Sequence, residues 1–80
     1  MALKFLFFAQ CADWMNCREV EFPLNGSARL LDLIGGDPRF APLAGKLDAL
    51  KVSVNETLTD FQAEVRDGDE VALMPPFSGG

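Results

Sequence analysis

Apolar and polar side chains alternate in several short stretches of the chain, and this period of two predicts β-strands. Residues 3–8 carry apolar side chains on both faces. In residues 19–24 a Val, a Phe and a Leu alternate with two glutamates and a proline, and residues 50–54 and 70–74 continue the strand pattern. Only a short break at residues 13–16 separates the first two strands, so we expect them to form a hairpin.

A short helix is expected between the second and third strands. Ser27 follows an Asn-Gly turn, and a serine there can cap a helix because its hydroxyl accepts a hydrogen bond from a first-turn amide. Leu30, Leu31 and Ile34 follow at helical spacing, and the two glycines after Ile34 end the helix. A helix of about two turns depends on packing more than on propensity.

Turn residues divide the rest of the chain. Residues 37–45 contain two prolines and predict an irregular segment or a broken helical turn. The pairs at 55–56 and 67–68 predict turns, and the weakly patterned residues 58–65 leave room for a short edge strand. The main elements then follow the order β-β-α-β-β. This is an α+β arrangement, in which one main helix covers one face of a mixed sheet.

The first and last strands are the most apolar, so we expect them to lie side by side at the centre of the sheet. Because alternate residues of a strand point to opposite faces, half of their apolar side chains would face away from the helix. These residues are Leu6, Phe8, Ala72 and Met74. They could instead belong to the core, but one short helix cannot cover both faces. An exposed apolar patch of this kind indicates a protein interface.

The composition excludes several classes of function. The 80 residues suffice for a single domain, 1–80, and 7 basic against 12 acidic residues give a net charge of −5. Nucleic acids and anionic membranes call for a basic face, so we expect neither as a partner. With no His and two Cys, the chain lacks the commonest general base and cannot form a four-thiolate zinc site. We expect no metal site.

The two cysteines bear on the compartment. The apolar N-terminal run has a lysine inside it and lacks a small-residue cleavage pattern, so no secretory signal is expected. Without one, Cys11 and Cys17 are expected to be reduced and the protein to be cytoplasmic. A redox or sulfur-relay role is the alternative, but neither thiol has a histidine or a CxxC context to activate it.

Two further features have structural explanations. Trp14 lies in a polar stretch and is expected to cap the core rather than to serve as a platform for a ligand. Asp67, Asp69 and Glu70 could suggest a cation site, but their spacing lacks the rest of a calcium loop. Turn chemistry with a solvated acidic edge is the favoured interpretation.

The residues after position 74 form a distinctive tail. Two prolines favour a stiff, extended run, and glycines without a Cβ can enter a channel too narrow for a side chain. We expect an extended, flexible tail that reaches about 19 Å and consists of Pro75, Pro76, Phe77, Ser78, Gly79 and Gly80. Its reactive group is the α-carboxylate of Gly80. An activating enzyme could convert it to an acyl-adenylate, and a sulfur nucleophile could then give a thiocarboxylate.

Four stretches of the sequence resemble the small subunit of molybdopterin synthase, a family of ubiquitin-like β-grasp sulfur carriers. They are Leu-Phe-Phe-Ala-Gln at 6–10, Val-Asn-Glu-Thr-Leu at 54–58, Asp-Gly-Asp-Glu-Val-Ala at 67–72 and the tail at 75–80. The resemblance covers nearly the whole chain and is most specific in its last 14 residues. It departs at residues 73–74, where relatives often place aromatic side chains.

The resemblance implies a cycle that involves three partner proteins. An E1-like adenylyltransferase would adenylate Gly80 with ATP and Mg, and a sulfurtransferase would supply the sulfur for the thiocarboxylate. The large synthase subunit would receive the tail, with Gly79 and Gly80 in its active site, and sulfur would pass to cyclic pyranopterin monophosphate in molybdenum cofactor biosynthesis. The family complex is a heterotetramer. In this picture the chain binds no cofactor of its own and is not catalytic alone.

Two other functions stay open at the level of the sequence. A sulfur carrier for thiamine, cysteine or tungsten-pterin synthesis would share the fold and the tail and would differ in its partner. A β-grasp interaction module would share the fold but use its tail for no chemistry. A stand-alone enzyme is disfavoured, because no pair of carboxylates, phosphate-binding loop or nucleophile triad is visible in the sequence.

Overall fold

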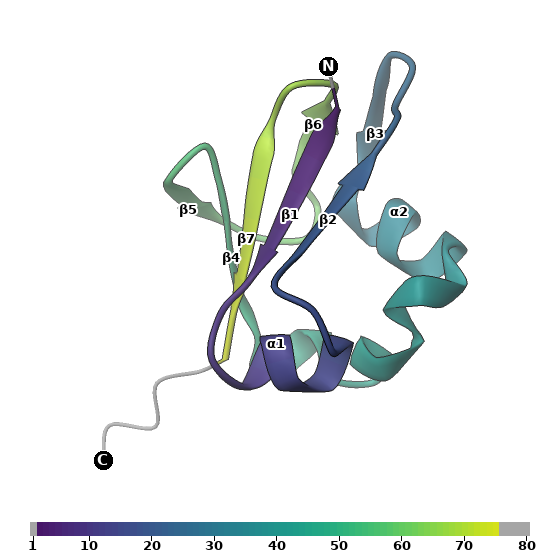
Figure 1. Ribbon diagram of the computed structural model, residues 1–80. Helices are drawn as coiled ribbons and strands as arrows, with labels where there is room; N and C mark the ends of the chain where they lie inside the picture. The colour runs from purple at the N-terminus through teal and green to yellow at the C-terminus, as the bar shows by residue number, and fades with distance from the viewer. Residues whose placement is uncertain (1, 76–80) are drawn as a thin grey trace.

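The computed structural model describes residues 2–75 (Figure 1). The elements in chain order are β1 (Leu3–Phe7), α1 (Gln10–Met15), β2 (Glu19–Phe22), β3 (Ser27–Arg29), α2 (Leu30–Gly36), the 3₁₀ turns η1 (Pro38–Leu43) and η2 (Leu47–Ala49), β4 (Lys51–Val54), β5 (Thr57–Thr59), β6 (Glu64–Arg66) and β7 (Glu70–Met74).

Five strands form a mixed sheet in the order β2-β1-β7-β4-β5. The first and last strands, β1 and β7, pair in parallel at its centre with Phe5 opposite Val71, and the other neighbours are antiparallel. The strands β3 and β6 form a separate two-stranded sheet. The predicted α+β arrangement and the central position of the two most apolar strands are confirmed.

The core lies on one face of the five-stranded sheet, where α2 and the 3₁₀ turns cover it (Figure 1). Phe40 connects η1 to the sheet. The centre of its ring lies 4.9 Å from that of Phe5, and the ring stacks on Phe22 with the two centres 5.5 Å apart. The guanidinium of Arg39 lies 4.1 Å from the centre of the Phe22 ring. The buried apolar residues are Leu3, Phe5, Phe7, Cys11, Leu30, Ile34, Phe40, Leu43, Leu50, Val52, Val65, Val71 and Leu73.

The start of α2 differs from the sequence prediction. Ser27 belongs to β3, so its predicted role as the helix cap is wrong. The first-turn amides of the helix find partners in a distant loop instead: Leu30 N donates to Ala63 O at 3.0 Å, and Leu31 N donates to Phe61 O at 2.9 Å. Because these acceptors come from far along the chain, the local sequence around the turn could not reveal them.

The structure adds a second α-helix, α1, between the two strands of the predicted hairpin. Its Cys11 is buried, and Trp14 packs against the core as expected. Lys46 lies 5.3 Å from the centre of the Trp14 ring. The helix ends at Asn16, whose φ of 58° is left-handed. The two strands pair antiparallel as predicted, but the connection between them is helical rather than a tight turn.

The predicted turns and irregular segment are confirmed, and the weakly patterned stretch resolves into two short strands. Residues 55–56 form a two-residue turn between β4 and β5, and both have positive φ, at 51° and 69°. The second turn contains Gly68, whose φ is 92°. Residues 58–65 contribute to the edge strand β5 and to β6. Within residues 2–75 we find no helix that is long and apolar enough to cross a membrane.

Candidate functional site: the open face of the sheet

The sheet face opposite the core, here called the open face, carries the residues predicted to form an interface. In the parallel pair of central strands, Leu6 lies opposite Ala72, and both are half-buried, as is Met74. Phe8 follows β1 and is 47% exposed, and its N–H donates to Leu73 O at 3.1 Å. The structure therefore brings the four predicted residues together beside the end of β7. Their role in binding stays a prediction.

The open face extends further than the sequence predicted. Leu6 pairs with Ala72, Ala72 with Ser53, and Ser53 with Leu58. These four residues form a continuous line across β1, β7, β4 and β5, here called the cross-strand row. Leu58 is 69% exposed and has the highest exposure among the exposed large hydrophobic residues of the described chain. The row joins the half-buried Leu6 and Ala72 to Leu58 through Ser53, which is polar and buried, and exposed apolar surface of this kind is typical of a contact with another protein.

Leu58 was missed in the sequence, although a signal for it existed. It lies alone between two threonines, so the apolar pattern of its own strand is weak. The two-residue turn at 55–56 fixes the pairing of Val54 with Thr57, and hence of Ser53 with Leu58. The register that follows from this turn places Leu58 on the open face.

A hollow of about 450 Å³ borders the open face where β1, α1 and β2 meet. Its lining includes the apolar Leu6 and Phe8 and three charged residues, which are Asp13, Arg18 and Glu19. Ala9 also lines it, with a φ of 50° and a ψ of −124°. The hollow thus continues the apolar surface toward the end of the sheet at which β7 stops.

The chain leaves the sheet at the same end. Met74 is the last residue of β7 and pairs with Lys51, and the half-buried Pro75 follows it. Figure 1 shows α1 beside this end of the sheet. The predicted tail residues Pro76, Phe77, Ser78, Gly79 and Gly80 lie outside the described residues, so their roles stay predictions.

The opposite end of the sheet is held by a hydrogen-bond network. Asn55 Nδ2 donates to Asp69 Oδ1 at 3.0 Å, and Asn55 Oδ1 accepts from the Glu70 N–H at 3.0 Å. Asp69 Oδ2 accepts from the Arg66 N–H at 2.9 Å. Both oxygens of Asp69 therefore serve the turn, and the described residues contain no group of three side chains able to hold a metal ion. The favoured explanation by turn chemistry agrees with this geometry.

The cysteines are placed for packing. Within residues 2–75 both thiols are free of disulfides, as expected, with Cys11 buried and Cys17 half-buried. Burial raises the pKa of the Cys11 thiol, which lowers its thiolate fraction. A buried thiol with little thiolate is poorly suited to sulfur relay.

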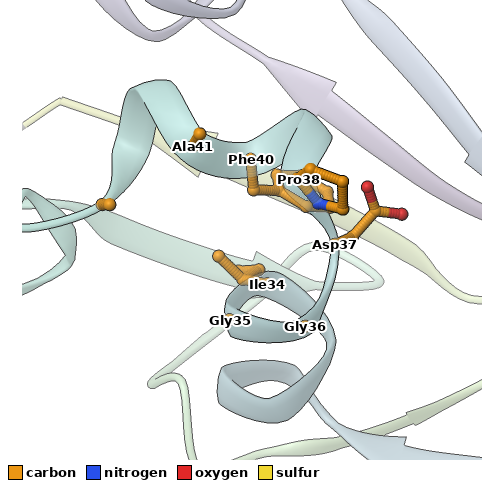
Figure 2. A pocket seen from close by; sticks show the side chains of 8 residues that line it. Ile34, Gly35, Gly36, Asp37, Pro38, Phe40 and Ala41 are labelled. Atoms are coloured by element: carbon orange, nitrogen blue, oxygen red, sulfur yellow. The ribbon is translucent and has the colours of Figure 1, made fainter.

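A second hollow, of about 420 Å³, lies between α2 and η1 on the covered side of the sheet (Figure 2). Ile34, Phe40 and Ala41 line it, and the carboxylate of Asp37 points away from Ile34 and Ala41. That carboxylate instead accepts from the backbone N–H of Arg39 at 2.8 Å and pairs with its guanidinium at 3.1 Å. The lining of the hollow is mostly apolar, and the carboxylate of Asp37, its charged lining residue among those described, is engaged by Arg39.

Comparison with known proteins identifies the family. A model described as the ThiS family matches residues 5–80. The chain belongs to the ThiS family. The molybdopterin synthase sulfur carrier subunit of Escherichia coli (strain K12) is 37% identical over 82 residues, which cover 98% of this chain and 99% of that protein. The subunit of the same name from Chlamydomonas reinhardtii is 31% identical over 83 residues and is covered completely, as is this chain. The family resemblance expected from the motifs is confirmed.

Solved structures place this ThiS family chain among ubiquitin-like folds. The crystal structure of SAMP1 from Haloferax volcanii has a TM-score of 0.76 and 28% identity, with both chains covered completely. The putative molybdopterin converting factor, subunit 1, from Pyrococcus furiosus has a TM-score of 0.77 and 26% identity, with 95% of this chain and 98% of that one covered. The ubiquitin-like β-grasp fold expected from the sequence is confirmed, with α2 as the main helix on the covered face.

One of the similar structures contains two subunits. It is a complex of subunits 1 and 2 of the molybdopterin-converting factor from Helicobacter pylori 26695, with a TM-score of 0.68, 23% identity and complete coverage of both chains. At this identity the likeness shows the shared fold.

Proposed function

We propose that the ThiS family chain is the sulfur carrier subunit of a molybdopterin synthase. The observation that carries the proposal is the cross-strand row, which ends in the exposed Leu58 and lies beside the point where the chain leaves the sheet after Met74. Further support comes from the family match, which runs to residue 80, and from relatives of that name that are matched over 99% to 100% of their length. The large synthase subunit would dock on the open face and receive the tail.

The proposed chemistry takes place at the Gly80 carboxylate. A carboxylate oxygen attacks the α-phosphorus of Mg-bound ATP on an E1-like adenylyltransferase, and pyrophosphate leaves. Persulfide sulfur from a sulfurtransferase attacks the acyl carbon and displaces AMP, and a thiol then reduces the acyl disulfide to the thiocarboxylate. In the large subunit the thiocarboxylate sulfur attacks an oxygen-bearing carbon of cyclic pyranopterin monophosphate, and that oxygen leaves as water. A second water then hydrolyses the resulting thioester, which leaves the sulfur on the pterin and restores the Gly80 carboxylate.

In this proposal the chain presents the reactive group and its partners supply catalysis. The described residues fit that division of work, because the Cys11 thiol is buried and the carboxylate of Asp69 is occupied by its turn. Gly79 and Gly80 would enter the narrow active site of the partner, and Pro75, Pro76, Phe77 and Ser78 would span the distance from the sheet. A cytoplasmic location belongs to the same proposal.

Intact mass spectrometry tests the carrier chemistry directly. Incubation with the E1-like adenylyltransferase of the same organism, Mg-ATP and a sulfurtransferase with its sulfur source should raise the mass by about 16 Da, because one sulfur replaces one oxygen. A variant that lacks Gly80 should gain nothing, whereas Ser78→Ala should gain the same mass. An unchanged mass of the full chain, with an adenylyltransferase that activates another carrier in parallel, would refute the proposal.

A second candidate function is attachment of the carboxylate to other proteins. It is favoured by the 28% identity to SAMP1 from Haloferax volcanii and by the 25% identity to a structure named small archaeal modifier protein 1 from the same species. In that case an immunoblot against the chain would reveal conjugates of higher mass in cell extracts, and these would disappear when Gly80 is deleted. Molybdoenzyme activity would persist in the same deletion strain, which separates this function from the carrier function.

A further inference from the structure

The charges of the open face are unevenly distributed. At the end opposite Met74, Lys4 lies between Glu21 on one side and Glu70 on the other in the strand pairing. Glu19, next along β2, lies opposite Leu6. Three glutamates therefore surround one lysine at the β2 side and the far end of the open face. The part nearest the end of β7 carries Lys51, which pairs with Met74.

Two of these glutamates have solvent-exposed carboxylates without a partner among residues 2–75. Lys4 Nζ lies 3.9 Å from Glu19 Oε2, and both side chains are exposed, so this pair is weak. Within residues 2–75, the carboxylates of Glu21 and Glu70 have neither an ion-pair nor a hydrogen-bond partner. Both residues are exposed. They are positioned to meet positive charge on another molecule.

The apolar side chains of the cross-strand row do not by themselves fix the orientation of a bound partner. Burial of apolar surface is favourable in any rotation that covers it, because the hydrophobic effect has no direction. Glu70 and Met74 belong to the same strand, four residues apart, which is about 13 Å along a strand. Charges at the far end of the face would therefore define one rotation, and that rotation determines where the tail enters the partner.

We propose that the partner bound to the open face carries Lys or Arg side chains opposite Glu21 and Glu70. These ion pairs determine the orientation in which the partner binds over the cross-strand row. This inference rests on the proposed function, because the partner tested is the large synthase subunit. The occupant favoured by charge complementarity is a protein with an apolar centre and a basic edge. A second copy of this chain, at a net charge of −5, would bring further carboxylates and is disfavoured.

The test compares two doubly neutralised variants that have the same net charge. Glu21→Gln with Glu70→Gln changes the open face, whereas Asp48→Asn with Glu64→Gln changes exposed residues of η2 and β6. Each has a net charge of −5 + 2 = −3. Association of each variant with the large synthase subunit of the same organism is followed by stopped flow at low and high salt. Thermal melting verifies that both variants are folded.

At low salt the association rate constant of the open-face variant should be lower than that of the unaltered chain by a factor of about five or more. That of the control should be lower by a factor of less than about two. The association rate of the unaltered chain should fall as the salt concentration rises. This salt dependence should be weaker in the open-face variant and unchanged in the control. Equal rates for both variants would overturn this inference and leave the proposed function standing. Failure of the unaltered chain to bind would overturn the proposed partner and this inference together. Self-association of the unaltered chain in sedimentation, without binding to the large subunit, would assign the face to a second copy.

Discussion

At the scale of single residues, Ala9 holds a backbone conformation that its Cβ opposes. Its φ of 50° and ψ of −124° lie in a region that glycine enters far more easily than alanine. The neighbouring bonds maintain it: Phe8 N donates to Leu73 O at 3.1 Å, while Cys11 N donates to Phe8 O at 3.0 Å. The chain must leave β1 and enter α1 within the two residues Phe8 and Ala9, and Ala9 carries the resulting strain.

Ala9→Gly should therefore stabilise the protein. Relief of a positive φ exceeds the entropy that glycine adds to the unfolded chain, so we expect a gain of about 1 kcal/mol, or about 4–8 °C in Tm. Ala12→Gly is the matched control, because it lies inside α1 and should cost about 1 kcal/mol. Thermal unfolding followed by circular dichroism measures both. Equal destabilisation by the two substitutions would refute the strain at Ala9.

Asp37 gives the stability a pH dependence of known sign. The side-chain hydrogen bond from Arg39, followed by its backbone N–H, holds the pKa of this carboxyl below its ordinary value. A carboxyl whose pKa is lower in the folded state stabilises the fold above its unfolded pKa. This contribution is lost as the pH falls through the folded pKa.

Asp37→Asn should lower the free energy of unfolding of the protein. The difference from the unaltered chain should be constant near neutral pH and should shrink as the pH falls below about 4. Urea unfolding at a series of pH values measures it, and Arg39→Gln should lose part of the same pH dependence. A difference in the free energy of unfolding that is as large in acid as at neutral pH would contradict this assignment.

At the scale of elements, the turn between β4 and β5 determines where Leu58 points. Both turn residues have left-handed backbones, with φ of 51° at Asn55 and 69° at Glu56. Asparagine tolerates that region and its side chain also bonds to the neighbouring turn, whereas glutamate has neither advantage. The turn therefore contains one well-suited and one poorly suited residue.

Substitutions at the two positions should have opposite effects. Glu56→Gly should stabilise the hairpin by about 0.5–1 kcal/mol, because Asn-Gly is the preferred pair for such a turn. Asn55→Ala should destabilise it by about 1–3 kcal/mol, through strain and through the lost bonds to Asp69 and Glu70. Chemical denaturation measures both. Destabilisation by Glu56→Gly would contradict the turn geometry.

Some helices and strands could be predicted from the sequence because their signals are local, and others could not. The strands β1, β2, β4 and β7 and the two turns follow from local rules, since the alternation and the Asn-Glu and Asp-Gly pairs are local patterns, whereas β3 was not predicted. The six-residue α1 is too short for a helical period to stand out, and its burial of Cys11 depends on η1 and β1. The N-terminus of α2 depends on acceptors at Phe61 and Ala63, which no local pattern reveals.

The residues of the candidate site also fall into those that the sequence could predict and those that it could not. Leu6, Phe8, Ala72 and Met74 were predictable because strand parity alone assigns them to a face. Leu58 required the register of a neighbouring hairpin, and the lack of partners for Glu21 and Glu70 within residues 2–75 required knowledge of what lies around them. A sequence thus predicts which side a strand residue faces better than it predicts its neighbours across the sheet.

At the scale of the whole molecule, the two sides of the sheet have different tasks. One side buries the core beneath α2 and the 3₁₀ turns, and the other keeps apolar surface exposed. Exposed leucines occur on both sides, with Leu58 on the open face at 69% and Leu31 on α2 at 37%. They provide a matched pair for separating binding from stability.

Leu58→Ser should weaken binding to the large synthase subunit by about tenfold or more, because a well-exposed apolar anchor of an interface is removed. Its free energy of unfolding should change by less than about 0.5 kcal/mol. Leu31→Ser should leave the affinity unchanged. Isothermal titration calorimetry and urea unfolding measure the two quantities. Equal loss of affinity in both variants would place the partner elsewhere on the molecule.

The parallel pairing of β1 with β7 has a consequence in time. Phe5 lies opposite Val71 although 71 − 5 = 66 residues separate them in the chain, so a nascent chain cannot complete its central ladder until nearly all of it has been synthesised. Contacts of such long range form late and slow folding. Ala72 and Met74 arrive with that same last strand. An unfinished polypeptide therefore has no open face to offer, and a partner that recognises this face selects for completed translation.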